Sequence, residues 1–235
     1  IESTYVKYAP LNTRKVIIEE FLDGSIHSVE AFIDGSGNPA ILPYIVDYQT
    51  GYDIGFEDNF HYSRTMPSVL PLGVQKDFLE TAEIAIRSLN MSNSAAHVEI
   101  IVTKDGPRIV EIGARNGGYR EWMHKQSQGI DIFGNLLKSL TNKPFELSAS
   151  RNYPSAVLEL FPRNAGNFVG ISNEENLRSL PSVKVITITY NLNDFMGKSS
   201  EGYKAGCIIK LHNTNLAQFE QDIEYINDHV YIETY

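Results

Sequence analysis

The stretch HVEIIVTKDGPRIVEIGARNGGY, residues 97–119, places two glutamates inside runs of apolar, β-favouring residues. Glu99 and Glu111 stand where a strand normally carries valine, isoleucine or leucine. Burying an ionised carboxylate there costs several kcal/mol unless a counter-charge compensates. Because the two runs flank a short turn sequence, the stretch predicts a β-hairpin that carries one carboxylate on each strand.

The turn sequence KDG, residues 104–106, predicts a three-residue connection with glycine at the position that needs a left-handed backbone. If Thr103 faces Pro107 across this turn, then Glu99 faces Glu111 and both side chains point to the same face. Their Cβ atoms would lie roughly 4.5–5.5 Å apart. A two-residue turn would shift the register and put the carboxylates on opposite faces.

Two interpretations fit an opposed carboxylate pair. Two solvated glutamates on an open face would sacrifice pairing energy, since like charges directly opposed on a sheet are destabilising. A metal site explains the pair better, because Mg²⁺ takes one or two carboxylates and completes its octahedron with waters and substrate phosphates. Arg115 and the following NGG sequence favour the same interpretation, since a guanidinium and exposed backbone N–H groups can converge on a phosphate or carboxylate.

The composition is that of a globular protein: 235 residues, 42% hydrophobic and 21% charged. The formal net charge of -9 and the sequence pI near 5.2 argue against nucleic-acid binding and against anionic membrane surfaces. Cys207 is the only cysteine, and this favours a reducing compartment, the cytoplasm. Its apolar neighbours predict that Cys207 is a core residue. No apolar run approaches the length of a membrane span. The chain opens on Ile1 instead of methionine, so we expect that upstream sequence has been removed.

Periodicity predicts a mixed α and β organisation. Residues 15–48 are typical of a three-stranded antiparallel meander, and residues 51–71 of a long loop that is functional or mobile. Amphipathic spacing predicts a helix over 72–91, and shorter helices are expected over 118–128 and 131–140. A linker precedes a boundary near Ser148. Beyond it we expect strands at 155–161, 184–190, 205–212 and 230–235, with a helix over 215–227.

Two motifs of the chain resemble motifs of a known protein family. HVE…VEIGARNGG resembles the metal-binding end of the ATP-grasp superfamily, and VIIEEFLDGSIHSVE resembles that family's adenine hinge. The branch it resembles contains amino-acid ligases, biotin carboxylase and the carbamoyl phosphate synthase large subunit. The resemblance covers roughly residues 16–140. It implies an α+β fold in which residues 1–147 are the downstream portion of an ATP-grasp domain, an antiparallel sheet with flanking helices. Residues 148–235 would form a small, separate α+β C-terminal domain.

The resemblance also implies site residues. Glu99 and Glu111 would hold Mg²⁺, with Mn²⁺ as an alternative, on the phosphates of ATP, and Arg115 would steady the transferring phosphoryl group. His27 is either a ribose contact or an ordinary strand residue. The hinge residues that would line adenine are Glu19, Glu20, Phe21 and Leu22. The residues expected on the substrate side are Gly117, Gly118, Tyr119, Arg120, His61 and Arg64.

Several of these substrate-side residues have a plainer interpretation. His61 and Arg64 lie in the long loop, where they either meet substrate or are solvated. Tyr119 and Arg120 follow the glycine pair at a helix start, where family members shape the substrate pocket, although a surface helix turn would look the same. His97 shares a face with Glu99, and a structural role is favoured for it.

The function implied is an ATP- and Mg²⁺-dependent ligase that joins a carboxylate substrate to an amine or similar nucleophile through an acylphosphate. The alternative is a non-catalytic nucleotide-binding or subunit-assembly module. It is suggested by Gly113 and Ile26, which stand where many members carry a metal-binding asparagine and a ribose-binding glutamate. The family's phosphate-binding lysine would precede Ile1, so we expect an upstream half in cis or in trans and no turnover by this fragment alone. A homodimer is a further option, and the substrate stays open.

Overall fold

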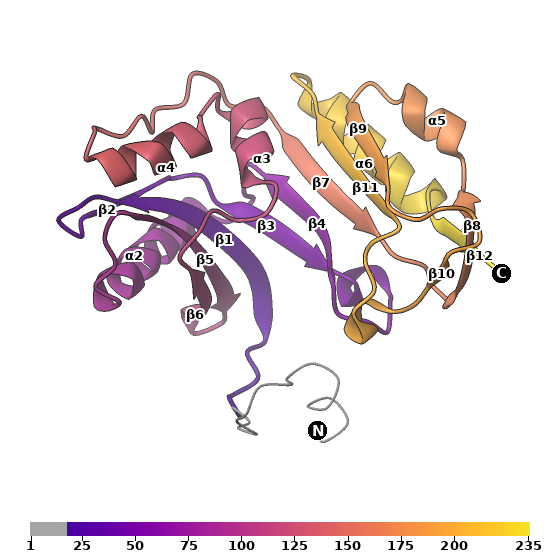
Figure 1. The fold of residues 1–235 in the computed structure, drawn as a ribbon, viewed down its shortest axis with the longest axis horizontal. Helices are drawn as coiled ribbons and strands as arrows, with labels where there is room; N and C mark the ends of the chain where they lie inside the picture. Colours follow the sequence, from indigo (N-terminus) through magenta and orange to yellow (C-terminus); the bar gives the residue numbers. More distant parts are fainter. Residues whose placement is uncertain (1–17) are drawn as a thin grey trace.

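The computed structural model describes residues 18–235 (Figure 1). Within these residues the chain forms a nine-stranded antiparallel sheet of order β6-β5-β1-β3-β4-β7-β11-β9, with β2 paired to β1. A small sheet of order β10-β8-β12 lies at the C-terminal end. The strands are β1 (Gly24–Ile33), β2 (Pro39–Ile41), β3 (Val46–Thr50), β4 (His61–Met66), β5 (Ser94–Thr103), β6 (Gly106–Gly113), β7 (Ser155–Leu160), β8 (Gly166–Ile171), β9 (Val183–Ile188), β10 (Phe195–Met196), β11 (Cys207–His212) and β12 (Ile232–Thr234).

Helices cover both faces of the large sheet. The helices are α2 (Leu72–Ser88), α3 (Arg120–Ser127), α4 (Ile132–Thr141), α5 (Glu174–Ser179) and α6 (Leu216–His229), with 3-10 turns η1 (Tyr52–Ile54) and η2 (Ser199–Glu201). Figure 1 shows α3 and α4 on one side of the β1–β5 region and α2 on the other. Among the described residues, none of these helices has both the length and the apolar character needed to cross a bilayer.

Strand β1 is buried along most of its length because helices pack on both of its faces. Its residues Val29, Ala31 and Ile33 pack with Phe78 and Ala82 of α2 in one core cluster. On the other face, Phe32 packs with Ile132 of α4 and its neighbours. Alternation along a strand therefore assigns odd-numbered residues of β1 to the α2 face and even-numbered residues to the α3–α4 face.

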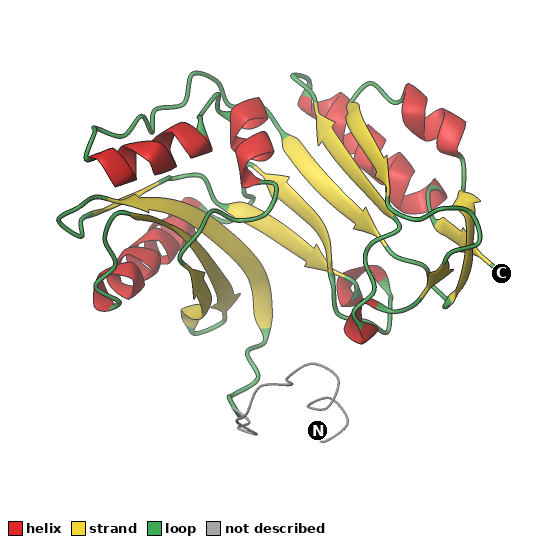
Figure 2. Ribbon diagram, in the orientation of Figure 1, coloured by secondary structure: helices red, strands yellow, loops and turns green. Residues whose placement is uncertain are grey.

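The predicted boundary near Ser148 falls inside a segment without helix or strand, as expected for a linker. The strands that follow it nevertheless extend the same sheet. β7 pairs with β4, placing Arg64 opposite Val157, and β11 and β9 continue outward from β7. Figure 2 shows these strands running on from the first half of the chain. Strands β7, β11 and β9 are therefore joined to the first half of the chain through backbone pairing, whereas β10, β8 and β12 form the small separate sheet.

The hairpin between β5 and β6 corrects the predicted turn. Thr103 pairs with Gly106, so the connection has two residues and not three. That register would bring Val110 opposite Glu99, but the register shifts between Glu99 and Ile100 and leaves Val110 unpaired. Because a bulge adds one residue to one strand, Glu111 moves into the position opposite Glu99. Glu99 and Glu111 are thus paired as predicted, but through a β-bulge and not through a three-residue turn.

Other expectations also need correction. The loop predicted over 51–71 contains β4, whose polar sequence HYSRTM lacks an obvious strand pattern. Residues 18–22, predicted as part of a first strand, carry no strand, and residues 15–17 lie outside the described part of the chain. The predicted helix over 72–91 is confirmed as α2, and the later predicted strands and helices are found within a few residues. Strands β8 and β10 and helix α5 were missed.

Candidate active site

The two glutamates of the opening hairpin lie side by side on the α3–α4 face. Glu99 of β5 pairs directly with Glu111 of β6, and directly paired residues of an antiparallel ladder point to the same side. The side chain of Glu99 is 21% exposed, whereas that of Glu111 is 62% exposed at the sheet edge. The pair therefore joins a sheltered carboxylate to one that is open to solvent.

Two hydrogen bonds hold Glu99 in its ionised form. His97 Nε2 lies 3.1 Å from Glu99 Oε1, and the Tyr48 hydroxyl donates to the same oxygen at 3.3 Å. The hydrogen bond to His97 outweighs the effect of burial and lowers the pKa of Glu99 to about 2. A carboxylate that stays ionised at all physiological pH values is a suitable ligand for a hard cation.

Behind Glu99 lies a buried ionic network centred on Glu30 of β1. His97 Nδ1 lies 2.5 Å from Glu30 Oε1, directly across the β1–β5 ladder. Burial alone would raise the pKa of Glu30, but the hydrogen bond with His97 and the charges of His97 and Arg120 lower it overall. Burial alone would lower the pKa of His97, but its hydrogen bonds to Glu30 and Glu99 raise it. Arg120, Glu30 and His97 thus form a chain of alternating charges, and His97 at its end fixes the position of Glu99.

Gly117 is part of this network through its backbone. Its N–H donates to Glu30 Oε2 at 3.0 Å, and a Cβ at this position would lie 2.4 Å from His97 Nδ1. Glycine is required because no side chain fits between the strand and the turn. The amide of Gly117, a residue expected on the substrate side, is thus occupied by an internal carboxylate. Gly118 is exposed, with open space where a Cβ would stand.

Arg120, also expected on the substrate side, lies in the interior with only 1% of its surface exposed. Its guanidinium donates to Ser28 Oγ at 3.0 Å and to the Tyr48 hydroxyl, and its Nε lies 3.6 Å from Glu30 Oε1. These contacts tie the start of α3 to β1 and β3. Arg120 is therefore placed to position Tyr48 and Glu30, which in turn position Glu99.

Arg115 lies beside the exposed half of the carboxylate pair. Its Nη2 is 3.9 Å from Glu111 Oε1, and its Nη1 donates to the Asn116 carbonyl at 3.2 Å. The side chain is 60% exposed. The structure thus brings together Glu99, Glu111 and Arg115, as expected from the sequence.

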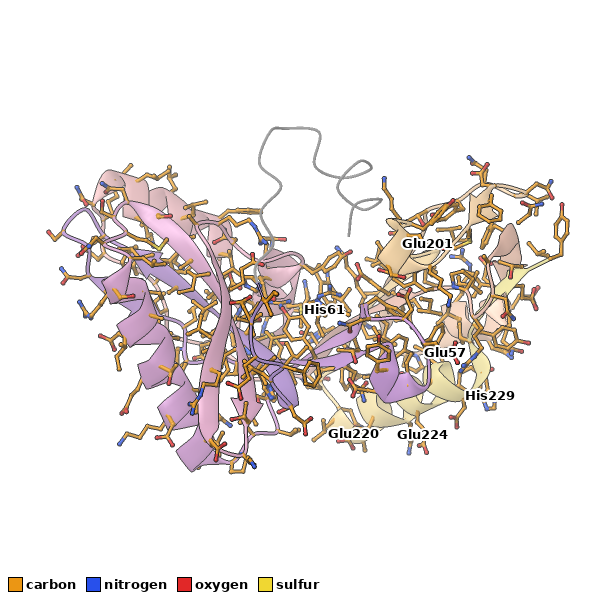
Figure 3. All side chains as sticks on the ribbon, turned by 90° about the horizontal axis from the view of Figure 1, so that it is seen from below. Glu57, His61, Glu201, Glu220, Glu224 and His229 are labelled. Atoms are coloured by element: carbon orange, nitrogen blue, oxygen red, sulfur yellow. The ribbon has the colours of Figure 1, made fainter. Side chains whose placement is uncertain are left out.

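His61 and Arg64 join the same face from β4. Arg64 pairs with Tyr48 across the β3–β4 ladder, and its guanidinium carbon lies 5.6 Å from the Tyr48 ring and 5.4 Å from the Tyr119 ring. The His61 ring packs on Tyr48 with centroids 4.6 Å apart. Burial, and then the charge of Arg64, lowers the pKa of His61. Figure 3 shows His61 between the part of the molecule that carries α2 and the part that carries α6.

Glu159 of β7 is a residue of this face that the sequence reasoning missed. Arg64 Nη1 donates to Glu159 Oε2 at 3.0 Å, and the Tyr119 hydroxyl donates to Glu159 Oε1 at 2.6 Å. Glu159 lies in the apolar run SAVLELF, so it shows the same pattern that drew attention to Glu99. The C-terminal part of the chain therefore contributes to the candidate site.

The hinge residues lie beside two cavities at the other end of β1. Phe21 and Leu22 line a cavity of about 570 Å³ together with Ile26, Tyr48 and Thr50. A second cavity of about 520 Å³, at the β5–β6 turn, is lined by Glu20 as well as by Phe21 and Leu22. Glu19 is exposed and lines neither of these two cavities. The larger cavity reaches Tyr48, the same residue that contacts Glu99.

His27 does not join the other expected residues. It points to the α2 face, where its ring meets Phe78 with centroids 6.1 Å apart. His27 Nδ1 lies 2.7 Å from Asp47, and Asp47 also accepts a hydrogen bond from the Val69 amide. This placement favours the interpretation of His27 as a structural strand residue that anchors the segment before α2.

Within the described residues, there is no group of three or more Asp, Glu, His or Cys side chains that could hold a metal ion. Two carboxylates are nevertheless what Mg²⁺ usually takes from a protein when phosphates supply the other oxygens. The ionised state of Glu99 and the exposure of Glu111 fit that role.

Residues 1–121, more than half of the chain, match the model of the ATP-grasp domain. The chain belongs to the ATP-grasp domain family. Over 118 residues it is 30% identical to phosphoribosylamine–glycine ligase from Methanococcoides burtonii, covering 46% of this chain and 27% of that protein. The ATP-grasp resemblance given by the two sequence motifs is thus confirmed.

Solved structures share the fold at lower identity. L-amino acid ligase from Bacillus licheniformis superposes with a TM-score of 0.74 at 18% identity, covering 92% of this chain and 53% of that one. Phosphoribosylglycinamide synthetase from Anaerococcus prevotii gives a TM-score of 0.70 at 15% identity, covering 92% and 55%. The α+β ATP-grasp architecture therefore extends over most of the chain, which spans about half the length of these enzymes.

Proposed function

We propose that this ATP-grasp chain is part of an ATP- and Mg²⁺-dependent ligase that joins a carboxylate substrate to an amine or a similar nucleophile. The observation that carries the proposal is the Glu99–Glu111 pair, with Glu99 kept ionised by His97 and Tyr48. Membership of the ATP-grasp family and the ligase names of the relatives support it.

The reaction has two steps. A carboxylate oxygen of the substrate attacks the γ-phosphorus of ATP, the bond to the β–γ bridging oxygen breaks, and ADP leaves with the bond electrons. The amine nitrogen then attacks the acyl carbon of the acylphosphate, inorganic phosphate leaves, and the nitrogen loses a proton. Catalysis of phosphoryl transfer is largely positioning and electrostatic stabilisation, so the residues that hold charge in place matter most.

Each residue of the site has a part in this proposal. Glu99 and Glu111 would hold Mg²⁺, or Mn²⁺ in its place, which would neutralise charge on the β- and γ-phosphates. Arg115, 3.9 Å from Glu111, would stabilise the negative charge on the transferring group. His61 and Arg64 would face the substrate, with Arg64 oriented by Glu159.

The hinge segment and the substrate side complete the proposed site. Phe21 and Leu22, with Glu19 and Glu20, would bind adenine beside the larger cavity. Gly118 and Tyr119 would border the substrate, whereas Gly117 and Arg120 would act from behind it, and His27 lies on the opposite face of the sheet. The proposed division is residues 1–147 as the ATP-grasp portion and 148–235 as the C-terminal unit. The upstream half of the ATP-grasp domain would come from the same chain or from another chain. We place the protein in the cytoplasm, and a homodimer is a further option for its assembly.

A non-catalytic nucleotide-binding module is the competing proposal. Gly113 supports it, because a glycine has no side chain to offer a metal as a third ligand. The experiment that separates the two measures ADP release by the complete protein across a panel of carboxylates, each paired with a panel of amino acids. Release that requires both a carboxylate and an amine supports the ligase. Metal-dependent ATP binding with no ADP release from any pair supports the module.

A further inference from the structure

Lys210 of β11 extends the site onto the C-terminal strands. It pairs with Val157 of β7, which pairs in turn with Arg64 of β4, so all three side chains lie in one row on the same face. Helix α3 covers this part of the face, since Met123 packs with Val157 in one core cluster. Lys210 thus lies two strands beyond Arg64, on the side away from Glu99.

Two aromatic rings from the start of α3 surround the lysine. Lys210 Nζ lies 5.7 Å from the centroid of the Tyr119 ring and 5.7 Å from that of the Trp122 ring. All three residues are partly buried and partly exposed to solvent. Cation–π contacts at such distances hold an ammonium in place without neutralising its charge.

The carboxylate nearest along the neighbouring strand is already engaged. Glu159 pairs with Ile208, two residues from Lys210, but its two oxygens accept hydrogen bonds from Arg64 and Tyr119. Among residues 18–235, Lys210 forms no ion pair. A partly sheltered cation that lacks a counter-ion, on the face that carries the candidate site, is an arrangement that favours an anionic ligand.

We propose that Lys210, held above Tyr119 and Trp122, binds an anionic group, a carboxylate or a phosphate, of one of the two substrates that the ligase joins. The assignment of the anion to a ligase substrate rests on the proposed function, but the anion site can be tested by itself. It makes the C-terminal part a determinant of substrate specificity, because a substrate that lacks this second anionic group would leave Lys210 without a counter-ion.

Trp122 provides the measurement, since it is the only tryptophan of the chain. The full-length protein is titrated with inorganic phosphate and, separately, with acetate, at constant pH and ionic strength and without ATP or Mg²⁺. Tryptophan fluorescence should change saturably with at least one of the two anions. Tighter binding of phosphate points to a phosphate ester as the ligand, and tighter binding of acetate to a second carboxylate.

Three variants, with a fourth in reserve, make the result specific. Lys210→Gln should weaken anion affinity roughly tenfold or more, as expected for the loss of a charge-assisted hydrogen bond. Lys210→Arg should keep the affinity within a few-fold, since it retains a cation that stacks on aromatic rings. Lys184→Gln is the matched control, because Lys184 is exposed on β9 and, within residues 18–235, donates only to the Pro181 carbonyl. If glutamine prevents folding, Lys210→Met gives the same test with a flexible side chain.

The proposal is overturned if the wild type shows no saturable response to either anion. It is also overturned if the neutral Lys210 variants bind as tightly as the wild type, or if Lys184→Gln loses as much affinity as they do. The titration contains neither ATP nor metal, so its outcomes can be interpreted even if the Glu99–Glu111 site fails to bind nucleotide. A failure of the ligase proposal and a failure of the anion site are thus distinguished.

Discussion

Glu111 lies directly opposite Glu99 because one residue, Val110, is left out of the β5–β6 ladder. The two-residue turn alone would have placed Val110 there and turned Glu111 to the other face. Val110 is 52% exposed, so leaving it unpaired at the sheet edge sacrifices little burial. The bulge is therefore a local adjustment that brings two like charges together, a juxtaposition that is unfavourable unless nearby positive charge offsets it.

The first prediction concerns stability in acid. The pKa of Glu99 is lowered from 4.5 to about 2, so its contribution to stability is present above pH 4.5 and is lost as pH falls toward 2. Urea unfolding at several pH values should show the wild type losing free energy of unfolding over this window. Glu99→Gln, which cannot titrate, should show a shallower loss. Equal slopes for the two proteins would mean that Glu99 is not held ionised by His97 and Tyr48.

The second prediction compares two adjacent glycines. Gly117→Ala should destabilise the protein by about 2–4 kcal/mol, since a Cβ would press on His97 and Glu30 in a buried ionic network. Gly118→Ala is the matched control, with nothing within 4 Å of the added methyl group, and should change stability by less than about 0.5 kcal/mol. Thermal and urea unfolding measure both. Similar losses at the two positions would contradict the role assigned to the Gly117 amide.

The third prediction concerns the pair that joins the two parts of the sheet. Arg64 and Glu159 are 12% and 19% exposed, so removing either partner leaves a sheltered charge uncompensated. Arg64→Met and Glu159→Gln should each destabilise by about 1–3 kcal/mol, and the double variant by less than the sum of the two. A double-mutant cycle on Lys76 and Glu80, an exposed pair on α2, should show no measurable coupling. Strict additivity for Arg64 and Glu159 would rule out their interaction.

Much of the fold could be predicted because its elements have strong local patterns. Helix α2 has the apolar spacing of an amphipathic helix, and the β5–β6 hairpin has two apolar runs around a short turn. Strand β4 could not be recognised in the same way. Its Arg64 is stabilised by Glu159, which lies 95 residues later in the chain, so the sequence HYSRTM alone reads as a polar loop.

The candidate site was predictable where a residue broke a local pattern. Glu99 and Glu111 stood out as charges within apolar runs, and Glu159 could have been found by the same criterion. His27 could have been placed as well, since it shares its strand parity with Val29 and Ala31, which face α2. The occupation of the Gly117 amide by Glu30 could not be predicted, because it joins residues 87 positions apart.

The most direct test of the proposed function is Mg²⁺-dependent ATP binding by the complete protein, measured by calorimetry for the wild type, Glu111→Gln and Glu80→Gln. Glu111→Gln keeps the size of the side chain and removes one negative charge from the proposed metal site. We predict that it lowers the metal-dependent gain in ATP affinity by roughly a hundredfold and leaves weak metal-free binding unchanged, as for the loss of a few kcal/mol of electrostatic stabilisation. The exposed control Glu80→Gln should behave as the wild type. If Glu111→Gln binds ATP with the same metal dependence as the wild type, Glu111 is a structural strand residue and the metal site proposed here is wrong.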